Sequence, residues 1–354
     1  MPKSLLNITG MNSTSFDPLV FAKAKAKEAY IEHCKHDPIP SAMVIVQNMD
    51  TSGLILHLIL IVMATITVGI YIEEVFYLKS NLKLSYRRRL SLLQAGIPTV
   101  FAVSSVVGCF FPAGNVMIDF VCSVYFGFGL HALLVLMVNY YGGQTQLLRR
   151  FEGRYVQTNT GPFCCCCFCL PSFKMTKSNF QVLWYATFQA AFTRPIVLFF
   201  EGIIKTDRTI AIPGMVYTGC LIASMLSGMW ALVIFRKASA TFIGRFRTTA
   251  KFFNFQLVLL IANVQPFVIK LCYIPCVLPY TFYTRKLIVN YQIMVVEFFI
   301  LSLTTRCLYR TTDDNVELER IEPTSTDTSP SEDILMETIE EKTNGNCSPD
   351  VSNV

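Results

Sequence analysis

Seven long apolar segments constrain the fold of this chain more than any other feature. A helix needs about 20 residues, each rising about 1.5 Å, to cross a hydrocarbon core of about 30 Å. The segments cover residues 52–78, 91–111, 116–141, 181–204, 213–235, 252–278 and 287–309. With 53% hydrophobic and 15% charged residues, the chain is too apolar for an ordinary soluble domain. The sequence therefore predicts an all-α integral membrane protein with seven transmembrane helices.

The apolar segments divide the chain into three parts. Residues 1–51 form a polar N-terminal tail, and residues 52–310 form the transmembrane domain, with a cysteine-rich loop at 142–180. Residues 311–354 alternate acidic residues with Ser, Thr and Pro and contain few large apolar groups. Such a composition cannot bury enough surface to offset chain entropy, so we expect this acidic tail to be disordered.

The loop charges predict the orientation of the segments. Loops after the first, third and fifth segments hold fifteen Lys and Arg residues, whereas the alternate loops hold four. Lys and Arg near segment ends stay cytoplasmic, so the N-terminus is expected outside and the C-terminus inside. Asn7 and Asn12 begin Asn-x-Ser/Thr sequons and are predicted glycosylation sites on the outer tail. The start is not basic and then apolar, which argues against a cleaved signal peptide.

Five cysteines lie within six positions of the loop between the third and fourth segments. They are Cys164, Cys165, Cys166, Cys167 and Cys169. Thiols next to a membrane helix are common palmitoylation sites, and several acyl chains would hold the loop firmly at the bilayer. Zinc binding is an alternative, but no second ligand pair follows, and we predict no metal. An unmodified apolar run is a third reading. Elsewhere, Cys34 and Cys276 form a possible extracellular disulfide pair.

Polar side chains recur every seven residues in three of the apolar segments. The three stripes contain Arg194 and Glu201; Gln256, Asn263 and Lys270; and Asn290, Glu297 and Thr304. A seven-residue step drifts by only about 20° on a helix, so each stripe stays on one face. An ionisable group at the bilayer centre costs about 2.5 to 3.5 kcal/mol, so each one needs a reason. We therefore expect the stripes to face a polar interior.

Two readings of these stripes stay open, besides snorkelling of the cations at the lipid surface. In the first, they line a solute path in which Arg194 and Lys270 attract an amphipathic anion. The path residues would be Arg194, Lys270, Glu297, Asn263, Gln256 and Glu201, with Pro195 and Pro266 supplying flexible or broken helix. In the second, Arg194 pairs with Glu297 or Glu201, and Lys270 pairs with Asp119, to hold helices together.

The remaining polar residues carry weaker signals. Glu73 and Glu74 are expected to form interfacial ion pairs near the cluster Arg87 to Arg89. His57 and His131 fit hydrogen-bonded structural roles better than proton coupling. No metalloprotease, hydrolase or phosphate-binding motif occurs, so we expect no enzyme, no catalytic residues and no cofactor. The basic residues lie between apolar segments, which indicates a membrane surface rather than nucleic acid.

Several motifs resemble one known family, the organic solute transporter alpha subunits. They are Tyr71 to Leu78 (YIEEVFYL), Pro98-Thr99-Val100, Tyr141-Gly142-Gly143, Gly161-Pro162 followed by the cysteines, Ala250-Lys251-Phe252, Phe255-Gln256, Gln265-Pro266, Glu297, Thr305-Arg306 and Tyr309-Arg310. They occur in order over residues 70–310. Two positions depart from the family pattern: Asn139 replaces an acidic residue, and Phe163 replaces the first cysteine.

The resemblance implies a seven-helix protein that moves bile acids, conjugated steroids and related organic anions passively in both directions. It also implies an obligate single-span beta subunit, passage through the endoplasmic reticulum, and the basolateral plasma membrane of epithelia. A basic residue at Arg194 and an acidic one at Glu297 agree with the family pattern. The alternatives are a seven-helix receptor, whose Asp/Glu-Arg-Tyr and Asn-Pro-x-x-Tyr motifs are missing here, and a trafficking protein that moves no solute.

Overall fold

The computed structural model describes residues 39–158, 172–206, 214–274, 282–311 and 315, and nearly all of them are helical. The α-helices are α2 (Ala42–Gln47), α3 (Thr51–Asn81), α4 (Ser85–Ala95), α5 (Ile97–Phe110), α6 (Asn115–Tyr140), α7 (Gln144–Arg150), α8 (Lys177–Thr206), α9 (Gly214–Ile243), α10 (Thr248–Leu271) and α11 (Phe282–Tyr309). Short 3-10 helices η1 (Pro112–Gly114) and η3 (Gly244–Phe246) precede α6 and α10. Two strands, β1 (Tyr155–Val156) and β2 (Phe173–Lys174), pair antiparallel.

Within these described ranges, 6 helical stretches are long and apolar enough to cross a membrane. They are Thr51–Asn81, Ser85–Phe110, Pro112–Tyr140, Gly219–Ile243, Thr248–Leu271 and Phe282–Tyr309. Each falls on one of the predicted segments, as an all-α membrane protein requires. The remaining predicted segment forms α8, a helix of 30 residues that is not one of the six. Its length suffices, but Arg194 and Glu201 make it more polar, and its crossing of the membrane stays a prediction.

Two predicted segments have different boundaries in the structure. The second is divided at Gly96, between α4 and α5, and Pro98 lies in the first turn of α5, where its missing N–H costs little. The sixth was expected to run to Leu278, but α10 ends at Leu271 and Cys272 is extended, with ψ of 139°. The sequence has a proline at 275, which disfavours helix in the residue before it. Apolar composition alone does not predict that the helix ends there.

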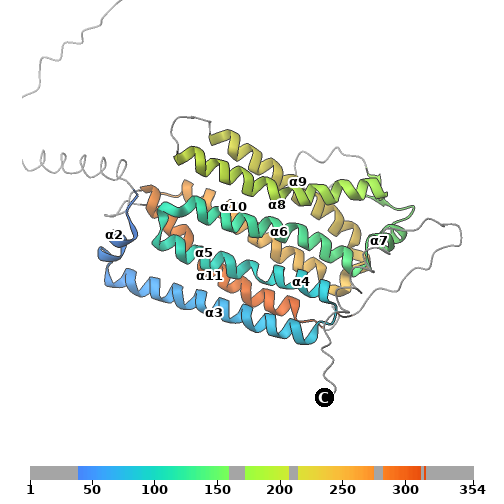
Figure 1. Cartoon of the computed structure of the whole chain (residues 1–354), viewed down its shortest axis with the longest axis horizontal. Helices are drawn as coiled ribbons and strands as arrows, with labels where there is room; N and C mark the ends of the chain where they lie inside the picture. Colours follow the sequence, from blue (N-terminus) through green and yellow to red (C-terminus); the bar gives the residue numbers. More distant parts are fainter. Residues whose placement is uncertain (1–38, 159–171, 207–213, 275–281, 312–314, 316–354) are drawn as a thin grey trace, which may run out of the picture. The chain divides into compact units, whose positions relative to one another are not determined.

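The long helices pack side by side around α6 and α11 (Figure 1). Helix α6 packs against α8 and α5, and α11 packs against α5, α10 and α3. A Cβ atom at Gly127 would lie 2.7 Å from the Cα of Ala191, so α6 and α8 approach through their backbones. Small residues permit this close approach between membrane helices. The tight contact holds Arg194 of α8 beside α6.

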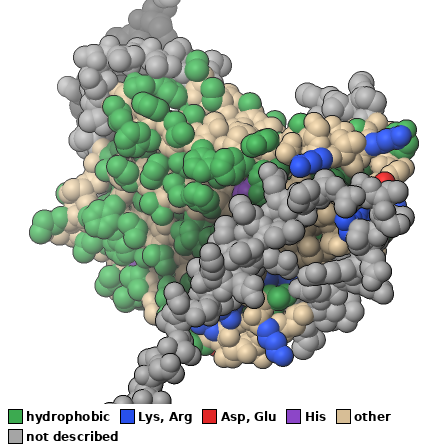
Figure 2. Space-filling model, turned by 45° about the vertical axis from the view of Figure 1, so that its right-hand side comes forward, with side chains coloured by type: hydrophobic (Ala, Val, Ile, Leu, Met, Phe, Trp, Pro, Cys, Tyr) green, Lys and Arg blue, Asp and Glu red, His purple; other side chains and the backbone are tan. Residues whose placement is uncertain are grey.

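Hydrophobic side chains cover much of the surface of the helices. Figure 2 shows them gathered over one part of the molecule, while Lys and Arg side chains gather at another part. Helix α3 illustrates the pattern, because Ile55, Val62 and Phe76 are all more than half exposed. A soluble protein rarely exposes such a continuous apolar surface, whereas lipid tails cover it without cost. The surface therefore agrees with a bilayer environment.

Glu73 and Glu74 form ion pairs near the end of α3, as predicted, and the structure identifies their partners. Arg306 donates to Glu73 at 2.6 Å, and Arg310 donates to Glu74 at 2.8 Å and to Glu73 at 3.0 Å. Although burial opposes it, hydrogen bonds to Glu74 and Glu73 raise the pKa of Arg310 above its ordinary value. The predicted interfacial ion pairs therefore form, and their partners lie at the end of α11, which is distant in sequence but ends beside α3.

Some predicted features lie outside the described residues. These are Asn7, Asn12, the cysteines Cys164 to Cys167 and Cys169, the pair Cys34 and Cys276, and most of the acidic tail. The described residues on either side of the cysteine run do form one feature. Tyr155 pairs with Lys174 and Val156 pairs with Phe173, so β1 and β2 bring the two ends of the loop together.

Candidate functional site

A cavity of about 350 Å³ lies inside the helix bundle, between α5, α6, α8, α9, α10 and α11. Asn115 at the start of α6 and Tyr283 in the first turn of α11 line one part of it, and Asn115 donates to the Tyr283 hydroxyl at 3.2 Å. Phe126 and Phe101 line another part and are both buried. From Asn115 to Phe126, α6 rises about 16 Å, so the cavity reaches deep into the bundle.

The cavity brings together four of the six predicted path residues, namely Arg194, Glu201, Asn263 and Lys270. They come from the stripes on α8 and α10, and Asn290 of the α11 stripe also lines the space. Gln256 and Glu297 do not line it. Gln256 lies two turns from Asn263 toward the other end of α10. Glu297 has Gln265 as its polar neighbour instead.

Arg194 connects four helices through neutral partners. Its Nε donates to Ser123 Oγ of α6 at 3.1 Å, and one terminal nitrogen donates to Asn263 Oδ1 of α10 at 2.8 Å. The other terminal nitrogen contacts the Met225 sulfur of α9 at 2.9 Å. A guanidinium has five N–H donors, so two are not used by these three contacts. The cation can therefore meet a ligand in the cavity without giving up its helix contacts.

The predicted ion pairs inside the bundle do not form. Arg194 bonds to Ser123, Asn263 and Met225 rather than to Glu297 or Glu201. No ion pair joins Lys270 to a carboxylate in the described part of the chain, although Asp119 lines the same cavity and interacts electrostatically with Arg194. The seven-residue spacing correctly placed several polar groups on one face, but it could not specify which side chains touch. The hydrogen bonds of Arg194 go to neutral partners instead.

Several residues of the cavity were not among the predicted path residues. Lys286 donates from its ammonium to the Lys270 carbonyl at 2.7 Å and thereby satisfies a carbonyl in the last turn of α10. In the sequence, Lys286 is one of the four cations in the loops after the second, fourth and sixth segments. Asp119, Ser123 and Phe126 also line the space, and their spacing of four and three residues is that of one helix face. That spacing was a usable signal on α6.

Prolines interrupt both helices that carry the basic residues. Pro195 lies inside α8 directly after Arg194, and Pro266 lies inside α10 between Asn263 and Lys270. A proline inside a helix leaves the carbonyl four residues earlier without its N–H partner. On α10 this is the carbonyl of Ala262, and both Ala262 and Pro266 line the cavity. The helix walls therefore add backbone polarity as well as side chains.

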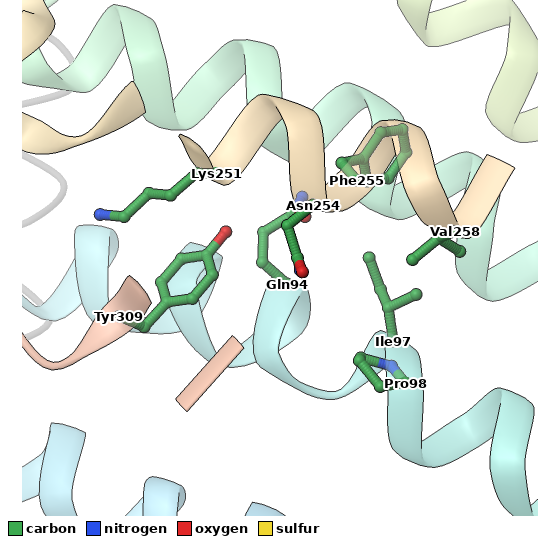
Figure 3. Close-up of a pocket in the computed structure, with 8 residues that line it drawn as sticks. All are labelled: Gln94, Ile97, Pro98, Lys251, Asn254, Phe255, Val258 and Tyr309. Carbon is green, nitrogen blue, oxygen red and sulfur yellow. The ribbon is translucent and has the colours of Figure 1, made fainter. Parts of the chain in front are cut away.

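A second, inner pocket lies between the start of α10 and the end of α11, and Figure 3 shows its lining. It is lined by Gln94, Ile97, Pro98, Lys251, Asn254, Phe255, Val258 and Tyr309, and it leaves no room for a water molecule. Lys251 is 1% exposed and donates to the Tyr140 hydroxyl at 2.8 Å. Its ammonium also lies 4.8 Å from the centre of the Tyr309 ring. The pocket is polar but has no free volume.

The two histidines of the apolar helices are hydrogen bonded. His57 Nδ1 lies 2.8 Å from the Gly53 carbonyl, and His131 Nδ1 lies 3.1 Å from Thr187 Oγ1. His131 also packs edge-on against Trp184, with ring centres 4.6 Å apart. Both residues thus have the structural contacts expected of them. Over the described ranges, no group of three His, Cys, Asp or Glu residues could hold a metal ion.

Comparisons with known proteins place the chain in one family. The family model of the organic solute transporter Ostalpha matches residues 56–314. The chain is 28% identical to organic solute transporter subunit alpha of Leucoraja erinaceus over 263 residues, which cover 71% of this chain and 75% of the relative. It is 28% identical to the Homo sapiens subunit of the same name over 292 residues, 79% of this chain and 86% of the relative.

A more distant similarity extends to invertebrates. An organic solute transporter alpha-like protein of Drosophila melanogaster is 26% identical over 178 residues, 49% of this chain and 54% of the relative. No solved structure matches the chain. The family match covers the apolar helices and the cavity, and the family is a class of transporter subunits rather than of enzymes. The chain belongs to the organic solute transporter Ostalpha family.

Proposed function

We propose that this chain is the alpha subunit of a heteromeric transporter for bile acids, conjugated steroids and related organic anions. Transport would be facilitative and would run in both directions across the plasma membrane. One observation carries the proposal: a cavity inside a bundle of apolar helices contains Arg194, a cation whose hydrogen bonds go only to neutral groups.

The size and lining of the cavity suit an amphipathic anion. Its volume of about 350 Å³ lies within the range of about 300–1,000 Å³ typical of small-molecule sites. Phe101, Phe126 and Leu198 offer apolar surface to a steroid body. The two N–H donors that Arg194 does not use can bind a carboxylate or sulfonate, because the guanidinium plane matches such groups. Lys270 and Lys286 add positive charge, and together with Arg194 they outnumber the carboxylates Asp119 and Glu201 of the same lining.

The sequence supports a passive process. It has no glycine-rich loop followed by lysine that could hold a nucleotide phosphate. Movement would then follow the solute gradient. We further propose that α8 crosses the membrane, which gives seven transmembrane helices with the N-terminus outside and the C-terminus in the cytoplasm. The excess of Lys and Arg in the loops after the first, third and fifth segments supports that orientation.

The subunit name shared by the relatives supports a partner chain. We propose a single-span beta subunit, delivery through the endoplasmic reticulum, and a basolateral location in epithelia. The cysteines from Cys164 to Cys169 would be palmitoylated, and Asn7 and Asn12 would be glycosylated. The paired strands β1 and β2 place the ends of the cysteine loop together, which suits a loop that is anchored at one membrane surface.

A flux assay tests the proposal directly. Uptake and efflux of a labelled conjugated bile acid are measured in cells that express this chain alone, with the single-span partner, or with the partner and Arg194→Ala. Saturable flux in both directions that requires the partner and falls with Arg194→Ala is expected. If both subunits reach the surface and no anion moves, the transport proposal is wrong, and stimulated nucleotide exchange on a G protein would then support a receptor.

A native thiol tests the cavity itself. Cys122 is a free, buried cysteine that lines the cavity, whereas the free, buried Cys109 does not. We expect a conjugated bile acid to slow alkylation of Cys122 without slowing that of Cys109. Peptide mapping by mass spectrometry measures both rates in the same sample, and Cys122→Ala identifies the signal. Equal protection of both thiols, or of neither, would place substrate binding elsewhere.

A further inference from the structure

The cavity and the inner pocket are separated by a single helical turn. On α5, Pro98 lines the inner pocket and Phe101 lines the cavity; on α10, Val258 lines the inner pocket and Ala262 lines the cavity. Three or four helical residues correspond to about 4.5 to 6 Å. The two spaces are therefore consecutive along the same helices, with a thin barrier between them.

Two pairs of aromatic rings occupy that barrier. Phe126 of α6 lines the cavity and stacks on Phe255 of α10, which lines the inner pocket, with ring centres 4.7 Å apart and planes at 19°. Phe101 of α5 packs against Phe298 of α11, with ring centres 4.8 Å apart. All four rings are at most 3% exposed. They come from four different helices, so the barrier spans the width of the bundle interior.

The lining beyond the rings is more polar than an ordinary packed core. Gln94, Asn254 and Tyr309 line the inner pocket together with the buried Lys251 (Figure 3). Gln94 donates from Nε2 to the Gly129 carbonyl, and Asn254 donates to Thr305 Oγ1 at 2.9 Å. Core positions of membrane helices are usually apolar or small, because buried polar groups are costly. Polar groups on both sides of an aromatic layer fit a route that is closed at that layer.

Helices α5 and α10, which line both the cavity and the inner pocket, each have a break near the barrier. The α4 to α5 junction at Gly96 lies two residues before Pro98, and Pro266 lies four residues after Ala262 on α10. Helices kink at such positions because the ladder of hydrogen bonds is interrupted. Small rotations at these breaks would separate Phe101 from Phe298 and Phe126 from Phe255.

We propose that the ring pairs Phe126–Phe255 and Phe101–Phe298 form the gate between the cavity and the inner pocket. The inner pocket is then the closed half of the solute route, and the structure represents a state open only on the cavity side. This inference rests on the proposed transport function, but the gate can be tested without measuring transport. A stacked aromatic pair contributes about 0.5 to 1.5 kcal/mol beyond its buried area, so its loss should raise opening roughly twofold to tenfold.

The test uses a cysteine placed behind the gate. Val258→Cys introduces a thiol of similar size at a position that is 1% exposed and lines the inner pocket. A membrane-impermeant maleimide is applied to the outside of intact cells and, separately, to inside-out vesicles. Labelling of residue 258 from the cavity side is compared between two proteins. One carries Val258→Cys alone, and the double variant carries Phe126→Ala and Phe255→Ala in addition. We expect slow labelling with the rings intact and roughly tenfold faster labelling in the double variant.

Phe180→Ala is the matched control. Phe180 is equally buried and packs on Phe235 with ring centres 6.1 Å apart, but it lines neither space. Rapid labelling with the gate intact, no change in the double variant, or an equal increase with Phe180→Ala would each overturn the gate. Flux is measured in parallel. Absence of wild-type flux contradicts the transport function, whereas unchanged labelling contradicts only the gate.

Discussion

At the cavity end of the bundle, Arg194 faces a space of about 350 Å³, whereas at the opposite end of α6 two cations are enclosed by aromatic rings. Arg87 donates to Asn139 Oδ1 at 2.9 Å, and its guanidinium lies 4.8 Å from the Tyr140 ring centre. Lys251 bonds to the same tyrosine through its hydroxyl. Arg87 and Lys251 are each 1% exposed.

This difference separates two uses of buried charge in one membrane protein. Cations packed against rings and amides gain cation–π and hydrogen-bond energy, and they leave no room for a ligand. A cation beside a cavity can exchange contacts with a solute. With the inner pocket closed, the cation beside the cavity is thus suited to binding, and the two cations enclosed by rings are suited to stability. Variants at the two ends should therefore have different consequences.

The largest effect is expected at Arg194. Arg194→Ala removes the cation that would bind the anionic group, and hydrogen bonds to charged groups contribute about 1.5–3 kcal/mol. Initial uptake per surface molecule should fall by about tenfold or more. Arg194→Lys keeps the charge and should lose less. If Arg194→Ala transports fully at normal surface levels, Arg194 is not a binding cation, and the proposed difference between the two ends is wrong.

Tyr140→Phe should affect stability rather than transport. It deletes the hydroxyl that accepts from Lys251 and keeps the ring that stacks on Phe246 at 4.3 Å. Losing a hydrogen-bond partner of a buried charge should lower the free energy of unfolding by about 1–3 kcal/mol. Thermal unfolding of the purified complex in detergent measures the change. A loss of flux per surface molecule as large as that of Arg194→Ala would contradict this prediction.

The paired carboxylates of α3 should differ from each other. The Glu74 side chain is 2% exposed and that of Glu73 is 51% exposed, although both bond to Arg310. Glu74→Gln should cost about 1–2 kcal/mol, because it weakens a buried charge-assisted hydrogen bond. Glu73→Gln should cost less, because solvent screens an exposed pair. Thermal unfolding of the two variants, measured under the same conditions, tests this difference. Equal losses of unfolding free energy would mean that burial does not determine the strength of these ion pairs.

The smallest change is expected at Lys286, near the start of α11. Lys286→Met removes one positive charge from the cavity lining and its contact with the Lys270 carbonyl. Half-exposed charges contribute about 0.2–1 kcal/mol, which corresponds to a rise in KM of up to about fivefold. Concentration-dependent uptake measures KM, with Lys237→Met on α9 as a control outside the cavity lining. A loss of uptake as large as that of Arg194→Ala would indicate that the anion binds nearer to α11.

Hydropathy and side-chain spacing predicted much of the architecture. Helix position along the chain depends on local composition, because the bilayer requires a long apolar stretch for each span. Six predicted segments therefore coincide with apolar helices, and the remaining one, at 181–204, forms the more polar α8. Seven-residue spacing likewise placed Arg194, Glu201, Asn263 and Lys270 among the polar faces that meet at the cavity.

Only the tertiary structure decided which helices face each other. Arg194 bonds to residues 71, 31 and 69 positions away, and no local pattern links such distant partners. Because local patterns do not link distant residues, the sequence could not show that Glu297 lies outside the cavity and Lys286 lies inside it. For the same reason it could not show that Glu73 pairs with Arg306. A repeat along one helix determines a face, and the packing of small residues such as Gly127 against α8 determines what that face meets.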